Sequence, residues 1–240
     1  MRCFELIYGH YSYPFSVESG GIKIEVTEES GLYLYRRECC GEVRENYIQP
    51  KEGRIIINPV EPVNLPSSVT SLLQVKFKNL VIEPQSVILV YLTFPIEIGV
   101  FLQTGKNIEV IDILSVSKQK YSLYGSPTNG TIVRYHESNI HRGIPETDIF
   151  NEGVLSLTVV NSGKEIVNLS RAVFDGWGMK LYYNDNSVSM VAEMNLLHNN
   201  TAETRFLSVP LIIGMNKSYE IYMSRKIPVM KRSFIMELGY

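Results

Sequence analysis

The sequence predicts an all-β protein made of two tandem antiparallel β-sandwich domains. The clearest signal is the segment Val154–Phe174, in which apolar residues alternate with Ser156 and Thr158 before a polar turn. Side chains of a strand point to alternate faces, so this alternation is typical of a strand buried on one face. Similar short runs recur along the chain, and no segment shows the period of about 3.6 residues that an amphipathic helix requires.

The expected strands of the first half are short and separated by turn residues. The proline-rich segment Asn58–Pro66 predicts an extended edge or a crossing loop, because proline removes a hydrogen-bond donor from the ladder. The expected strands are Ile22–Val26, Leu32–Arg36, Arg54–Asn58, Leu73–Phe77, Leu80–Ile82, Val87–Phe94, Ile96–Leu102 and Ile108–Val116.

The densest cluster of chain-breaking residues, Gly125–Gly130, predicts the boundary between the domains. We therefore expect an N-terminal sandwich over residues 1–125 and a C-terminal sandwich over residues 126–240. Phe77–Leu92 and Phe206–Met223 show a weak sequence similarity. Duplication of one unit and convergence on one β pattern explain it equally well. The expected strands of the second half are Thr131–Tyr135, the two strands of Val154–Phe174, Met179–Tyr183, Ser187–Leu197, Thr204–Val209, Tyr219–Met223 and Ser233–Leu238.

Composition and charge exclude several classes of protein. The chain has 240 residues, with 23 Lys and Arg against 25 Asp and Glu, so no overall positive field favours nucleic acid. The most hydrophobic segment, Val87–Leu102, is interrupted by Thr93, Pro95 and Glu97, so we expect no transmembrane segment. Three cysteines, two of them adjacent, fit no disulfide framework and favour a reducing cytoplasm.

No catalytic, metal or cofactor motif stands out. The stretch Ser115–Lys118 matches S-x-x-K, but that motif requires a helix and this context is extended. His136 and His141 lie near Glu146 and Asp148, yet their spacing matches no zinc template and a solvated loop is the default interpretation. We expect no cofactor, no catalytic residue and no metal, so that a chelator should leave folding unchanged.

Two functional hypotheses concern carboxylates and aromatic residues. Glu61, Glu97 and Asp175 are candidate carboxylates of a hydrolase site, but sequence alone cannot pair them. Trp177, with Tyr182 and Tyr183, forms a candidate binding surface, because protein interfaces favour Trp and Tyr. The competing interpretation of Trp177 is a core residue beside flexible glycines, and it carries the greater weight.

Several blocks in order resemble one protein family. They are INPVEPVNLP from Ile57, YLTFPIEIGVF from Tyr91, KYSLYGSPTNGTIVRY from Lys120 and AVFDGWGMKLYY from Ala172. The chain resembles, over nearly its whole length, an archaeal family known only as a domain of unknown function. The resemblance implies an archaeal source and implies no active site.

The sequence therefore favours a binding or structural module that contacts a protein partner or a second copy of itself. A symmetric homodimer would pair exposed edges within Met179–Leu197, a stretch without proline. The alternative is a hydrolase with a carboxylate-based or metal-dependent site. Convergence of Glu61, Glu97, Asp175 and the loop from His136 to Asp148 in one pocket would favour that alternative.

Overall fold

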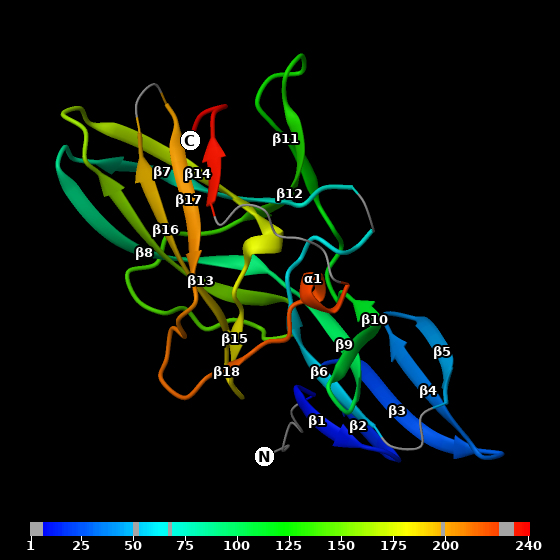
Figure 1. Cartoon of the computed structure of the whole chain (residues 1–240). Helices are drawn as coiled ribbons and strands as arrows, with labels where there is room; N and C mark the ends of the chain where they lie inside the picture. The colour runs from blue at the N-terminus through cyan, green and yellow to red at the C-terminus, as the bar shows by residue number, and fades with distance from the viewer. Residues whose placement is uncertain (1–6, 50–52, 67–68, 198–199, 226–232) are drawn as a thin grey trace.

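The computed structural model describes residues 7–49, 53–66, 69–197, 200–225 and 233–240. It confirms an all-β fold, in which helical structure among these residues is limited to η1 (Gly176–Gly178) and α1 (Ile221–Ser224). The strands form four sheets that pack as two sandwiches, one at the lower right of Figure 1 and one at the upper left. No helix in the described part of the chain is long and apolar enough to cross a membrane.

The first sandwich consists of two antiparallel four-stranded sheets. One has the order β1-β6-β9-β10, and the other has the order β2-β3-β4-β5. Their strands are β1 (Gly9–Ser12), β6 (Arg54–Val60), β9 (Glu97–Thr104) and β10 (Asn107–Leu114), then β2 (Phe15–Ser19), β3 (Ile22–Glu29), β4 (Leu32–Cys39) and β5 (Glu42–Ile48).

The second sandwich also has two sheets, and both contain parallel pairs. The first has the order β11-β12-β7-β14, with β11 (Tyr121–Tyr124), β12 (Thr131–Glu137), β7 (Leu72–Ile82) and β14 (Val167–Asp175). The second has the order β18-β15-β16-β13-β8, with β18 (Asn216–Lys217), β15 (Tyr182–Tyr183), β16 (Val188–Leu196), β13 (Glu152–Asn161) and β8 (Ser86–Pro95), and with β17 (Ala202–Leu207) and β19 (Ser233–Met236) at its side.

Parallel pairing corrects the expectation of purely antiparallel sheets. β12 runs parallel to β7, and β13 runs parallel to β16. Parallel neighbours need a long connection between them, whereas a short turn can join only antiparallel strands. The alternation of apolar and polar residues does not reveal strand direction, so the sequence could not distinguish the two arrangements.

The sheets do not divide at the expected boundary between residues 125 and 126. β11 and β12 flank that point and pair with each other, and Gly130 donates a backbone hydrogen bond to Ser126 in the turn between them. The breaker cluster therefore forms a hairpin turn. Moreover, β7 and β8 from the first half pair with β14 and β13 from the second half. The strands β7 and β8 thus belong to the second sandwich, although β6 before them and β9 after them belong to the first.

The edge proposed for dimerisation is not free. β16, the longest strand of Met179–Leu197, lies between β13 on one side and β15 and β17 on the other. β15 lies between β16 and β18. Both β15 and β16 are therefore already paired on two sides within the chain.

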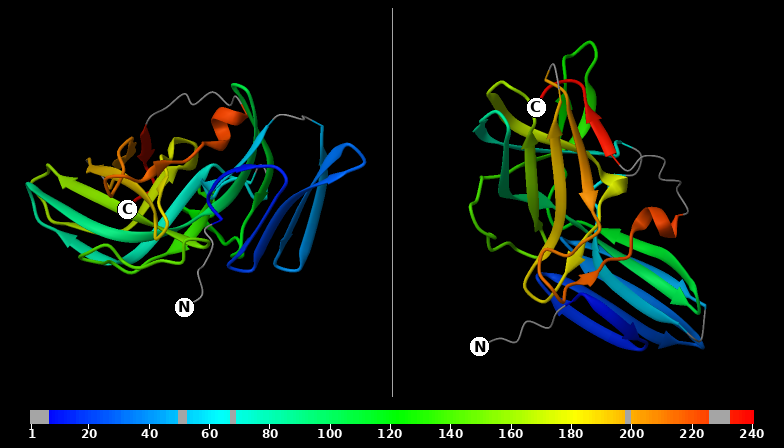
Figure 2. Two further views of the ribbon diagram at one scale, coloured as in Figure 1. Left: turned by 90° about the horizontal axis from the view of Figure 1, so that it is seen from below. Right: turned by 60° about the vertical axis from the view of Figure 1, so that its left-hand side comes forward.

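The segment from Lys217 to Arg225 places α1 against the β1-β6-β9-β10 sheet of the first sandwich, whereas β19 near the C-terminus pairs in the second sandwich (Figure 2). Ile221 of α1 is buried with Ile56, Val60 and Phe101 in a second hydrophobic cluster, separate from the main core. Ser224 ties the end of α1 to β10, because its Oγ accepts a hydrogen bond from the backbone N–H of Val110 and donates to the carbonyl of Ile108. The expected strand Tyr219–Met223 is therefore replaced by one turn of helix.

Asp112 joins the two sheets of the first sandwich. Its carboxylate is buried at a bulge in β10 and accepts hydrogen bonds from Tyr35 Oη at 3.0 Å and Arg37 Nε at 2.9 Å. Arg44 Nη1 also lies 2.6 Å from Asp112 Oδ1. Asp112 offsets most of the cost of burying Arg37, because it is the nearer of the two carboxylates that pair with this guanidinium.

We predict that Asp112→Ala destabilises the protein by about 3–5 kcal/mol, because the buried Arg37 guanidinium loses its 2.9 Å contact and keeps only exposed Glu42, at 3.9 Å. Urea unfolding followed by circular dichroism measures this loss. Arg44→Ala is the matched control: Arg44 is largely exposed, and its removal should cost at most about 1 kcal/mol. Equal losses in the two variants would contradict the assigned role of Asp112.

Candidate functional site

The three aromatic residues proposed as a binding surface lie mostly inside the protein. Tyr182 and Tyr183 are only 7% and 5% exposed. Trp177 is partly buried and packs against the cluster that contains Ile221. The region around Trp177 therefore closes the contact between α1 and the first sandwich, and only the tryptophan retains an exposed part.

Two of the three candidate carboxylates come together at the junction of the sandwiches. Glu61 follows β6, Glu97 begins β9, and both are buried. A third carboxylate, Glu220, precedes α1 and is also buried, and its charge acts on Glu61. Asp175 is engaged differently from Glu61 and Glu97: its Oδ1 accepts a hydrogen bond from the backbone N–H of Trp177 and caps η1.

Burial governs the protonation of these acids. Burial raises the pKa of Glu61 to about 8, with contributions from the charges of Glu220 and Glu97, while the backbone N–H of Tyr222 bonds to Glu61 and opposes the rise. Burial also raises the pKa of Glu97 to about 7, against the charge of Arg134. Glu97 accepts backbone N–H groups from Asn64 and Leu65 at 3.1 and 3.3 Å. These bonds hold the loop that follows β6.

Glu220 is tied to a lysine and a tyrosine. Lys180 Nζ lies 2.8 Å from Glu220 Oε1, and it also contacts the hydroxyl of Tyr222. Lys217 Nζ lies 3.7 Å from the same oxygen. Because Lys180 comes from the second sandwich and Glu220 from the segment that places α1 against the first, this ion pair fastens one sandwich to the other.

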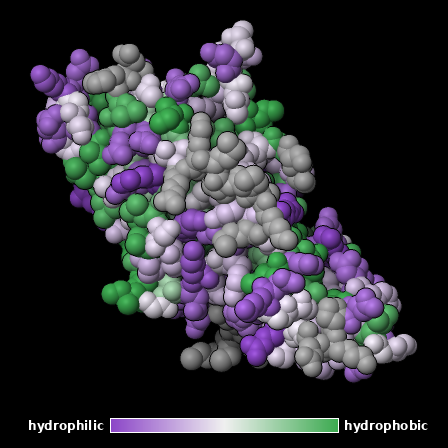
Figure 3. Space-filling view, viewed as in Figure 1, coloured by the Kyte–Doolittle hydropathy of each residue, from purple (hydrophilic) through white to green (hydrophobic). Residues whose placement is uncertain are grey.

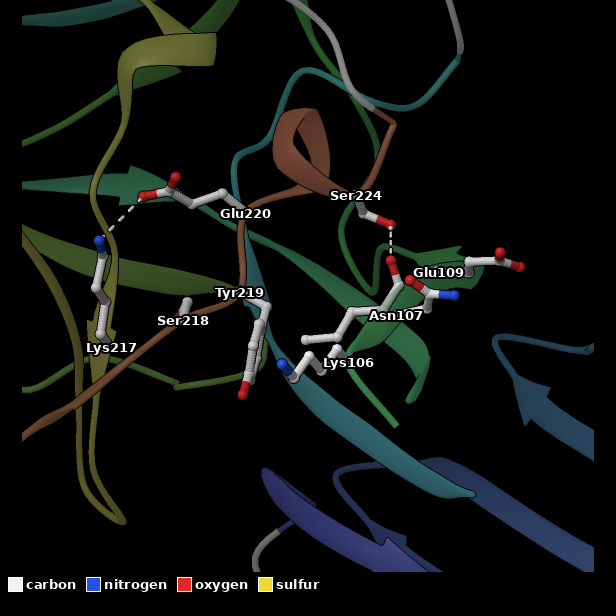
Figure 4. A pocket seen from close by; sticks show the side chains of 9 residues that line it. Lys106, Asn107, Glu109, Lys217, Ser218, Tyr219, Glu220 and Ser224 are labelled. Carbon is white, nitrogen blue, oxygen red and sulfur yellow. Dashed lines mark hydrogen bonds and ion pairs between the residues drawn. The ribbon is translucent and has the colours of Figure 1, made fainter. Parts of the chain in front are cut away.

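A pocket of about 650 Å³ opens beside this group, and we call it the junction pocket. Its walls are the turn between β9 and β10 and the segment from Lys217 to Ser224. Figure 4 shows Tyr219 between Lys217 and Lys106, with Glu220 directed towards Lys217. Glu61 and Glu97 are not among the residues that line this pocket. The two carboxylates proposed for hydrolysis therefore do not line this pocket, and both oxygens of Glu97 are engaged with backbone N–H groups.

The loop proposed for metal binding does not gather its histidines. His136 accompanies Glu137 and Asp148 in a second pocket, of about 430 Å³, which also includes Arg134 and Lys120; we call it the Arg134 pocket. His141 instead pairs with Tyr91 through two backbone hydrogen bonds. Across the described residues, no group of three His, Cys, Asp or Glu side chains is arranged to hold a metal ion.

Among the described residues, the most exposed large apolar side chain is that of Ile213, in the loop between β17 and β18. Ile213 is 99% exposed, Val209 is 46% exposed and Ile212 is 40% exposed, and we call Val209–Ile213 the apolar loop. It is the orange loop at the left of β18 in Figure 1, and apolar atoms protrude at the same place in Figure 3. In the similarity between Phe77–Leu92 and Phe206–Met223, Leu211–Ile213 corresponds to the strand residues Leu80–Ile82. In the structure Leu211–Ile213 lies outside the strands, and Ile212 and Ile213 are exposed.

Sequence reasoning missed Glu220, Arg134 and the apolar loop as functional candidates. Arg134 and His136 are two positions apart in β12, so the alternation placed them on one face. Nothing in the local pattern indicated that this face would be buried. Four apolar residues close to Pro210 and Gly214 were a usable signal for the loop, because that composition suits neither a solvated turn nor an uninterrupted strand.

Together these features define a two-sandwich β protein with a charged junction and an exposed apolar loop. Residues 7–237 match the family model described as protein of unknown function (DUF432), and the chain belongs to that family. No curated protein matches the chain. No solved structure matches it either.

We predict that Glu61→Gln flattens the dependence of stability on pH. In the folded protein Glu61 keeps its proton up to about pH 8, whereas the unfolded chain releases it near its ordinary pKa of 4.5. The wild type should therefore lose up to about 1.4 kcal/mol per pH unit between these values as pH rises, and the variant should lack this contribution.

Melting temperatures of both proteins between pH 5 and pH 9, at roughly one-unit steps across this window, measure the difference. Glu109→Gln removes an exposed carboxylate at the junction pocket and should follow the wild-type curve. Parallel curves for wild type and Glu61→Gln would show that Glu61 is not held protonated.

Proposed function

We propose that this protein is an interaction module that binds a protein surface through the apolar loop. The observation that carries the proposal is the near-complete exposure of Ile213, together with Val209 and Ile212, within five consecutive residues. Scattered exposed apolar residues are normal, but a contiguous apolar surface on a projecting loop is typical of an interface.

The energetics support a binding role. Burying an isoleucine side chain contributes about 1.5–3 kcal/mol, and the loop forgoes this gain at Ile213 when the chain is alone. Pro210 and Gly214 shape the turn, and Gly214 has a φ of 93°, which a residue with a side chain adopts only with strain. The loop forms a turn between β17 and β18, in which the N–H of Met215 bonds to the carbonyl of Ile212.

The structure supports a binding role for the apolar loop better than it supports a hydrolase site at the junction of the sandwiches. Hydrolysis by two carboxylates requires both groups to reach the substrate. Both oxygens of Glu97 accept backbone N–H groups, from Asn64 and Leu65. Glu61 does not line the junction pocket, and burial raises its pKa to about 8, so that it keeps its proton at neutral pH. This arrangement favours binding over catalysis.

A second copy of this chain is the partner that we test first, and a different protein is the alternative outcome. We also infer that the protein works in the reducing cytoplasm of an archaeal cell. The inference draws on Cys39 and Cys40, which are both free thiols in the structure, and on the resemblance noted above.

We predict that the purified chain self-associates and that Ile213→Asp weakens the association by at least about tenfold, because a charge replaces a side chain worth roughly 1.5 kcal/mol or more on burial. Sedimentation equilibrium over a wide concentration range measures this effect. Val43→Asp is the control: Val43 is an exposed apolar residue of the first sandwich, and its variant should associate as the wild type does.

If the wild-type protein is monomeric, the partner must be a different protein, and a second experiment tests for it. A photo-crosslinking residue at position 213, introduced in the cells that make this protein, should then yield one predominant protein adduct that position 43 does not yield. A monomer in solution together with identical adducts from the two positions would overturn the proposal.

A further inference from the structure

Arg134 is a buried charge that its neighbours satisfy only in part, through the side chain of Tyr121 and the charge of Glu97. The residue is only 1% exposed, yet its Nε and Nη1 atoms have no hydrogen-bond partner among the described residues. Its guanidinium lies 5.7 Å from the centre of the Tyr121 ring. A cation over an aromatic ring gains about 0.5–2 kcal/mol, which is small beside the cost of leaving a buried charge unpaired.

The nearest candidate counter-charge is already engaged. Glu97 and Arg134 affect each other electrostatically, but no ion pair within 4.0 Å joins them in the described part of the chain. Both carboxylate oxygens of Glu97 accept backbone N–H groups instead. Two guanidinium donors are thus left without a protein acceptor.

Those donors belong to a residue that lines a pocket with further positive charges. Lys118 and Lys120 lie in the segment before β11 and also line the Arg134 pocket. Both lysines are exposed, whereas Arg134 is almost fully buried, so the lysines are the more accessible cations of this pocket. An oxyanion that enters this pocket would meet an arginine, whose planar group suits two-point contact with carboxylate or phosphate.

His136 reports a positive local field. It lies two residues from Arg134 and its Nε2 is 2.8 Å from Thr93 Oγ1. Burial lowers the pKa of His136 to about 4, and the charges of Lys120 and Arg134 lower it further. The imidazole is therefore neutral at pH 7 and can donate or accept a hydrogen bond without adding charge.

Acidic groups limit what can enter. Asp148, Glu137 and Glu152 also line the pocket. The Asp148 carboxylate is engaged with the backbone N–H of Phe150 at 3.0 Å and with the side chain of Asn151, and Glu137 accepts the Tyr135 hydroxyl at 3.4 Å. Three acids line the pocket beside the three cations, so its charge is nearly balanced and does not favour a long polyanion such as nucleic acid.

We propose that the Arg134 pocket binds one small oxyanion, with a carboxylate or phosphate group held by Arg134 and closed in by Lys120 and His136. This site is independent of the apolar loop, which lies in a different part of the second sandwich. The anion would supply the acceptors that the two free guanidinium donors lack. Carboxylate and phosphate share this chemistry, so the test compares the two directly.

The test uses the full chain with inorganic phosphate and with malonate as probes. Isothermal titration calorimetry at low, constant ionic strength should show saturable binding of one anion per chain for at least one probe. Arg134→Gln should weaken binding more than tenfold, and Lys120→Gln should weaken it several-fold, because the exposed lysine adds only a long-range attraction. Lys106→Gln, an exposed lysine of the junction pocket, should leave the affinity unchanged.

A second readout separates a ligand site from general charge effects. In proton NMR spectra, the bound anion should raise the pKa of His136 from about 4, because a negative charge beside Arg134 offsets the local positive field. If Arg134→Gln fails to fold, the exposed pair Lys118→Gln and Lys120→Gln in one variant provides the comparison. Absence of saturable binding by either probe, or equal affinity in the lysine variants and the wild type, would overturn the proposal.

Discussion

The passage of the chain from β8 to β9 holds the two sandwiches together. Only Ile96 separates these strands, and its N–H bonds to the carbonyl of Asn151. β8 pairs with β13 over ten residues in the second sandwich, and β9 pairs with β6 in the first. Because nearly continuous backbone pairing runs through the junction, neither sandwich can shift without breaking ladder hydrogen bonds.

This constraint explains why charged groups gather at the junction. The N-terminal end of β9 places Glu97 where loops from both sandwiches converge, and the segment that leads into α1 adds Glu220 against Lys180. The backbone N–H groups of Asn64 and Leu65 need acceptors in a place that water reaches poorly, and Glu97 provides them. Glu97 thus holds the loop after β6, and Glu220 pairs with Lys180, so raised pKa values here do not by themselves mark catalysis.

The two functional proposals rest on the opposite kind of observation, in which a group lacks a partner. Ile213 exposes apolar surface that water does not favour, and Arg134 buries donors that the described chain does not satisfy. A native fold tolerates few such groups, so each points to something that completes it. The apolar loop fits a protein surface, whereas the Arg134 pocket fits a small anion.

The sequence by itself determined the all-β class and most strand positions, and it marked Gly125–Gly130 as a break in the chain, although it interpreted this break as a domain boundary. These features depend on neighbours in the chain: a period of two places one face inward, and glycine permits a tight reversal. The sequence also named Glu61 and Glu97 as candidate carboxylates, together with Asp175, without pairing them. Only the tertiary structure decided that β7 pairs with β14, that Glu220 joins the two acids and that Arg134 is enclosed. Those outcomes depend on contacts between segments many residues apart, and strand alternation is the same whichever partner a strand finds and however deeply its polar face is buried.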